Sequence, residues 1–114
     1  MITNKANGKK INAPYEIADT FEARASGLMF APAPKCILFK FEKNGNYPIH
    51  SLFVFFEFDA VYLDANMRAV EIFEKVAPFQ PFISPKKDAL FLLETPMGYV
   101  KRLGIKTGDK LELK

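Results

Sequence analysis

The sequence contains no tryptophan, and it has one cysteine and one histidine in 114 residues. A single cysteine cannot close an internal disulfide, so a small scaffold held together by disulfides is excluded. One histidine and one cysteine also supply too few nitrogen and sulfur ligands for a typical zinc site. No apolar run reaches the ~20 residues of a membrane-spanning helix. The sequence therefore predicts a domain without a metal, a cofactor or a membrane span.

The net charge of +3 is concentrated at the amino terminus. Residues 1–14 contain three lysines and no acidic side chain, and the other thirteen basic side chains are matched by thirteen acidic ones. Lysine and arginine do not cluster on one predicted element, as they do in proteins that track a phosphate backbone. The sequence thus argues against nucleic-acid binding. Residues 1–14 also lack the apolar stretch of a signal peptide, which predicts a cytoplasmic protein unless a leader has been removed.

The composition, with 49% hydrophobic and 25% charged residues, is typical of one globular domain. Twelve phenylalanines and four tyrosines favour strands over a helical bundle. Several short strands and two short helices, near 20–26 and 96–103, predict a mainly β (α+β) fold, either a compact β-sandwich or a partly closed barrel. No repeat or linker divides the chain. We therefore expect a single domain over 1–114, with a polar, basic segment at 1–14.

The stretch from Tyr47 to Asp64 is the most apolar part of the chain. Apolar side chains occupy both strand parities over residues 49–56, which predicts a central strand buried on both faces. Further strands are expected at 15–18, 36–41, 69–76, 89–94 and 110–113. For the helices, Asp19 or Thr20 can cap the first and Gly27 ends it; Thr95 and Pro96 resemble the start of the second, which Gly104 ends.

Three groups of residues occur in order and at a characteristic spacing. They are T-x-E-x-R-x-x-G-L-M from Thr20, F-D-A-V-Y-L-D from Phe58, and L-L-E from Leu92 with Gly98 and then G-I-K-x-G-D from Gly104. Together they resemble the prokaryotic family known as domain of unknown function 192, over about Tyr15 to Leu113. The resemblance implies a compact, mainly β fold. It implies no reaction, because the family is uncharacterised.

The chain departs from this family pattern at several polar positions. Many members have a Trp-Met-Lys-Asn-Thr run where residues 50–54 read His-Ser-Leu-Phe-Val. Glu57 stands where proline is usual, and Ser26 and Ala31 stand where arginines are common. An activity that depends on those groups in other members cannot be carried over to this chain.

Two carboxylates, Asp59 and Glu94, lie within apolar strands. Burying an unpaired charge is costly, so each should have an arginine, a lysine or a set of backbone amides as its partner. Arg24 is the natural candidate. One interpretation is a polar latch that ties the first helix to the sheet; the other is a binding site. A glycosidase-like carboxylate pair would need a separation that the sequence does not define.

His50 is the only histidine, and two interpretations of it stay open: a partly buried side chain bonded to backbone or a carboxylate, or a ligand-contacting or acid–base group. Cys36 begins an apolar strand and is expected to be an unreactive core residue. The preferred function is a non-catalytic module that binds a small molecule or a protein through a cleft beside Asp59 and the proline- and phenylalanine-containing loop at 77–87. The alternative is a small hydrolase that uses His50 with Asp59 or Glu94 as acid and base.

Residues 77–87 contain three prolines and are predicted to form an irregular loop. The loop carries Phe79 and Phe82, for which two interpretations are open. Both rings could fold over the sheet as a lid on the core. Alternatively, one ring stays exposed beside Phe73 and forms an apolar patch that binds a partner or a ligand. The partner and the oligomeric state are not defined by the sequence.

Overall fold

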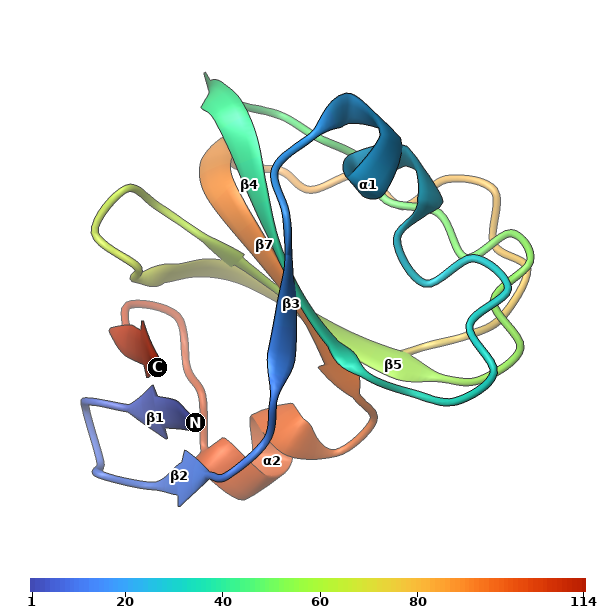
Figure 1. The fold of residues 1–114 in the computed structure, drawn as a ribbon. Coiled ribbons are helices and arrows are strands. Elements are labelled where there is room, and N and C mark those ends of the chain that lie inside the picture. Colours follow the sequence, from blue (N-terminus) through green and yellow to red (C-terminus); the bar gives the residue numbers. More distant parts are fainter.

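The computed structural model describes residues 1–114, apart from the side chain of Phe21. It has two β-sheets and two short helices (Figure 1). The larger sheet contains, in order, β3 (Tyr15–Ala18), β4 (Cys36–Gly45), β7 (Ala89–Pro96), β5 (Phe58–Leu63) and β6 (Ala69–Val76). The smaller sheet contains β2 (Lys10–Ile11), β1 (Ile2–Asn4) and β8 (Leu111–Leu113). The two sheets confirm the predicted mainly β fold as a sandwich, and they do not close into a barrel.

The larger sheet is mostly antiparallel. Only β3 and β4 are parallel among its four strand pairs in the described chain. β5 and β6 form the predicted hairpin, whose turn is fixed by Asp64: its Oδ1 accepts from the backbone N–H groups of Asn66 at 2.8 Å and Arg68 at 3.0 Å. This arrangement puts β7 in the middle of the sheet, so its side chains are covered on both faces.

The two faces of the larger sheet contribute to separate cores. Leu93 and Val61 pack with the smaller sheet and with helix α2 (Tyr99–Leu103). Leu92 and Tyr62, one residue away in each strand, belong to the other core, which also contains Leu28 just after helix α1 (Phe21–Ser26). All six residues of β5 are buried. A strand covered on both faces has apolar side chains at both parities, which is the pattern expected for this stretch.

The predicted central strand is only half correct. Residues 58–63 form β5, but residues 46–57 are irregular except for a single bridge between Ile49 and Ile83. Phe53 and Phe55 are exposed, and Phe53 has a left-handed backbone with φ of 59°. Hydrogen bonds of Ser51 to the 77–80 loop keep this segment out of the strand ladder. Apolar side chains at both parities therefore did not mean a strand over residues 49–56.

The helices agree with the prediction at three of their four ends. In α1, Thr20 Oγ1 accepts from the Ala23 N–H at 3.1 Å, and the chain leaves the helix at Gly27 with φ of 47°. α2 ends at Gly104 with φ of 60°, but it begins at Tyr99 rather than near residue 96. Thr95 and Pro96 are still part of the β7 ladder with β5. In the described chain, neither helix is long and apolar enough to cross a membrane.

The polar amino-terminal segment is part of the fold. Ile2 pairs with both Ile11 and Leu113 in the smaller sheet, so the two chain ends lie together (Figure 1). Asn4 is fully buried, and its Nδ2 donates to Leu103 O and to Asp109 Oδ2, each at 3.0 Å. β1 and β2 were not predicted from the sequence, because Ile2 and Ile11 are isolated apolar residues among polar ones.

Candidate functional site

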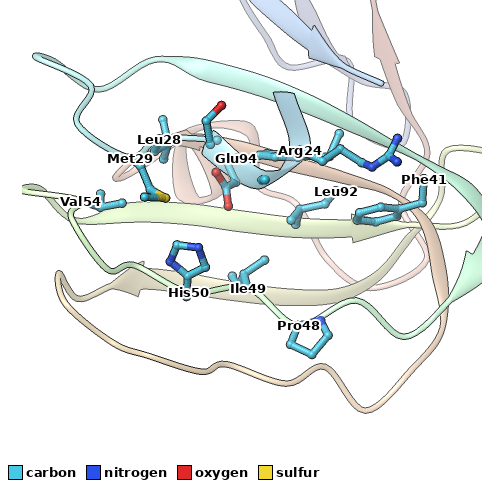
Figure 2. Close-up of a pocket in the computed structure, with 14 residues that line it drawn as sticks. Arg24, Leu28, Met29, Phe41, Pro48, Ile49, His50, Val54, Leu92 and Glu94 are labelled. Carbon is cyan, nitrogen blue, oxygen red and sulfur yellow. The ribbon is translucent and has the colours of Figure 1, made fainter. Parts of the chain in front are cut away.

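A recess of about 90 Å³ lies between the larger sheet, the end of α1 and the segment around residue 50 (Figure 2). Its walls contain both apolar and polar side chains. Its polar side chains include those of Arg24, His50 and Glu94, whereas its apolar walls include Leu28, Phe39, Phe41, Val54 and Leu92. The recess therefore brings together three of the residues that the sequence analysis singled out.

Glu94 is placed in the recess by its position on β7. It pairs with Ala60 on one side and Ile37 on the other, and it projects from the same face as Leu92. The side chain is only 5% exposed, and Figure 2 shows its carboxylate pointing into the recess. Within the described part of the chain, no hydrogen bond or ion pair to this carboxylate is found. The partner expected from the sequence is thus missing.

Burial governs the ionisation of Glu94. Desolvation raises the pKa of this carboxyl from its ordinary value of 4.5 to about 8. Near neutral pH the group is therefore mostly protonated, so it can both donate and accept a hydrogen bond. A neutral carboxyl that faces the recess can serve as a proton donor or a hydrogen-bond donor, and after it loses its proton it can be the counter-ion of an arriving cation.

Asp59 belongs to the opposite face of the sheet. Its Oδ1 accepts from the Lys75 N–H at 3.0 Å, and its Oδ2 accepts from the N–H groups of Gly98 at 3.0 Å and Val100 at 3.1 Å. These bonds satisfy free amides at the start of α2, where Gly98 has no side chain to cap the helix. Backbone amides are one of the expected kinds of partner for Asp59. The geometry of Asp59 therefore supports the interpretation as a polar latch. The latch joins β5 to α2 and to β6, rather than joining the first helix to the sheet.

Arg24 connects α1 to β4. One guanidinium nitrogen donates to Asp19 O at 2.8 Å and to Lys40 O at 3.3 Å, and the other lies 3.3 Å from Glu42 Oε1. In Figure 2 the guanidinium points away from the Glu94 carboxylate. The proposed pairing of Arg24 with Asp59 or Glu94 is therefore wrong within the described contacts, although a link between the first helix and the sheet does exist.

His50 reaches the recess from an anchored irregular segment. Its Nδ1 accepts from the Leu52 N–H at 3.2 Å, which leaves the proton of a neutral imidazole on Nε2. The neighbouring Ser51 is fully buried; its Oγ donates to Ala77 O at 2.5 Å and accepts from the Gln80 N–H at 2.7 Å. Ser51 is a positioning residue that the sequence analysis did not identify, since a lone serine in an apolar run gives no specific signal.

The loop phenylalanines do not line the recess. Phe79 is 56% exposed and Phe82 is 68% exposed, so the lid interpretation is wrong. The ring centroids of Phe79 and Phe55 lie 5.4 Å apart in an edge-to-face contact. Phe73, the neighbour expected from the sequence, instead packs edge-to-face against Tyr62, with 6.2 Å between the ring centroids.

The buried thiol offers no second reactive site. Cys36 belongs to the core on the α2 side of the sheet, and desolvation raises its pKa to about 11, partly opposed by the positive amino terminus. Among the described residues, no group of three His, Cys, Asp or Glu side chains is arranged to hold a metal ion. The recess around Glu94 is therefore the best candidate site.

Several known proteins are similar to this chain in sequence or in fold. The model of the uncharacterized ACR family, domain of unknown function 192, matches residues 2–113. A UPF0127 protein of Pyrococcus abyssi is 32% identical over 98% of this chain and 96% of its own length. A UPF0127 protein of Thermococcus kodakarensis is 32% identical over 96% of this chain and 70% of its own length. A crystal structure from Sinorhizobium meliloti 1021, described as a candidate transcription regulator, has a TM-score of 0.87 and 25% identity, covering 97% of this chain and 88% of that one.

Proposed function

We propose that this chain, which belongs to the uncharacterized family domain of unknown function 192, is a non-catalytic domain. It binds a small molecule in the recess, at Glu94. This refines the sequence-based preference for a binding module, whose cleft was expected beside Asp59 and the loop at 77–87. A cytoplasmic location and a protein partner stay predictions from the sequence.

One observation carries this proposal. Glu94 is a carboxyl with 5% exposure, has no partner among the described residues, and faces an open recess. Among the described residues, no side-chain oxygen or nitrogen that is closed off from solvent lacks a hydrogen bond, so the unbonded carboxyl oxygens of Glu94 are accessible from the recess. A ligand that enters the recess can therefore bond to them directly. Asp59 is buried to a similar degree but already accepts three backbone hydrogen bonds, so the same argument does not apply to it.

The size of the recess limits the ligand. Its volume of about 90 Å³ is smaller than the ~150 Å³ of an engineered cavity that holds benzene. Only a small group, or the end of a larger molecule, can enter. The entering part should have an apolar body, which contacts Phe39, Leu92 and Val54, and one polar group that bonds to Glu94.

Methyl-detected NMR tests this function directly. The probes are fragments of about four to six non-hydrogen atoms, namely small alcohols, amides, amines and carboxylates. We expect at least one class to shift the methyl signals of Leu28, Val54 and Leu92, which line the recess. Leu63 and Leu103, in the other core, are the internal controls. If no fragment class shifts the recess methyls at millimolar concentration, the proposed function is wrong.

A second candidate is the acid–base hydrolase. It is favoured by one observation, that His50 and Glu94 line the same recess. A protonated carboxyl with a pKa of about 8 is suited to proton donation near neutral pH. Under this alternative, hydrolysis of a small ester such as ethyl acetate should be lost in both His50→Gln and Glu94→Gln. A wild-type rate equal to that of both variants would eliminate it.

A further inference from the structure

The chemistry around Glu94 restricts the class of ligand. The carboxylate has neither an ion pair nor a hydrogen bond among the described residues, and the walls of the recess include Phe39, Leu92 and Val54. A carboxylate in such surroundings favours a cation that brings its own hydrogen-bond donors, because charge-assisted hydrogen bonds are about twice as strong as neutral ones. Above about pH 8, where the Glu94 carboxyl is ionised, an anionic ligand would be repelled.

Neighbouring charged and titratable groups are compatible with a cation. On α1, the Arg24 guanidinium is held by Glu42 and by the Lys40 and Asp19 carbonyls, and it is directed away from Glu94. On β5, the hydroxyl of Tyr62 donates to Tyr47 O, and its pKa is raised first by burial and then by Glu94. His50 also lines the recess. None of these groups is bonded to the Glu94 carboxylate among the described contacts.

The volume of the recess limits which kinds of cation can enter it. A recess of about 90 Å³ is smaller than the ~150 Å³ engineered cavity that binds benzene, so it favours a compact cation over one with an aromatic ring. A divalent metal would lack further ligands, because no cluster of His, Cys, Asp or Glu is present in the described part of the chain. A primary ammonium is a compact group with three donors, and a short alkyl chain behind it would contact the apolar walls.

We propose that the recess binds primary amines carried on a short aliphatic chain, with the ammonium group on the Glu94 carboxylate and the chain against Phe39, Leu92 and Val54. This inference rests on the proposed binding function and names its ligand class. The amine could be a free small molecule or the end of a longer one. The shared chemistry is the alkylammonium head.

The proposal predicts a specific dependence of affinity on pH. Free Glu94 holds a proton up to about pH 8, whereas the ammonium complex requires the ionised carboxylate. Binding therefore releases a proton, and the affinity for the amine should rise about tenfold between pH 6 and pH 7 and level off above pH 8. Binding of an uncharged alcohol to the protonated carboxyl should not gain affinity as the pH rises.

The probes are n-propylamine, which stays protonated throughout this range, and propan-1-ol of the same length, both titrated into the full chain by methyl-detected NMR. We expect the tenfold rise for propylamine in wild type and in His50→Gln, which removes the other titratable group of the recess wall. Glu94→Gln should bind propylamine at least tenfold more weakly at pH 8 and show no pH dependence.

Either of two results would overturn the amine assignment: propylamine leaving the recess methyls unshifted, or an affinity that does not change with pH in wild type. If propan-1-ol or another neutral fragment still binds, only the ligand class is wrong and the binding function stands. If no fragment binds, both are wrong. The wild-type pH series decides the question even if Glu94→Gln fails to fold.

Discussion

Asp59 and Glu94 lie on paired strands, one residue apart in register, yet their carboxylates project from opposite faces of the sheet. Asp59 pairs with Thr95, and Glu94 pairs with Ala60. Asp59 bonds to the backbone at the start of α2, whereas Glu94 faces the recess beside α1. A glycosidase-like pair is therefore excluded, because its two carboxylates must flank one bond. Each of the two has a separate role.

Asp59→Ala should destabilise the fold. The change leaves the N–H groups of Lys75, Gly98 and Val100 without their acceptor, and we expect a loss of about 1–3 kcal/mol in the free energy of unfolding. Urea denaturation measures it. Glu57→Ala, at an exposed position without such bonds in the described structure, is the matched control and should change stability by less than about 0.5 kcal/mol. Equal denaturation midpoints for wild type and Asp59→Ala would contradict the structural role.

Glu94 should make stability fall as the pH rises. Its carboxyl keeps a proton up to about pH 8 in the folded protein but only up to about pH 4.5 in the unfolded chain. Between these values the folded state binds more protons, so the contribution of Glu94 declines with pH by at most roughly 1.4 kcal/mol per pH unit. Above pH 8 this decline ends.

Glu94→Gln isolates this effect, because the amide cannot ionise. Its melting temperature relative to wild type should increase from pH 5 to pH 8. Glu71→Gln is a suitable control, since Glu71 lies on β6 in the same sheet and accepts from the Lys86 N–H in a more exposed position. A constant difference between Glu94→Gln and wild type over this range would show that the carboxyl is not desolvated.

Cys36 should react slowly with thiol reagents in the folded protein. Its side chain is 3% exposed, and desolvation raises its pKa to about 11, so little thiolate forms near neutral pH. Labelling followed by mass spectrometry should be slow until denaturant is added. Complete labelling of native protein within seconds would mean that β4 opens readily or that the thiol is accessible.

Phe79→Ser and Phe82→Ser should leave the fold stable. Both rings are exposed, so each change should alter the free energy of unfolding by no more than about 1 kcal/mol. Phe58→Ser, at a position that is 1% exposed, is the destabilising control and should lose about 3 kcal/mol or more. Unfolding of either loop variant at room temperature would restore the lid interpretation.

The fold could be predicted from the sequence where local chemistry determines the structure. Thr20 caps α1 and Gly27 ends it, as their side chains and backbone freedom predict. Similarly, the Asp64 turn and the alternation of β6 gave the hairpin. The face of the sheet that carries Glu94 could also be predicted in part, because residues 92 and 94 of one strand must share a face.

Other features depend on contacts between distant segments. Ser51 anchors residues 46–57 through the 77–80 loop, and a pattern of apolar residues does not reveal such an anchor. The late start of α2 depends on Asp59, some forty residues earlier in the chain. The partner of Arg24 was mispredicted for the same reason, since Glu42 is brought to it only by the β4 strand.

The most direct test of the binding function is the ¹³C signal of the Glu94 carboxyl, followed by NMR as the pH is changed, with and without a fragment that shifts the recess methyls. We predict a titration midpoint near pH 8 in the free protein, because the carboxyl is buried without a partner. We also predict that a bound fragment moves this midpoint, because it contacts the carboxyl. A midpoint near the ordinary 4.5 that no fragment moves would contradict a binding site at Glu94.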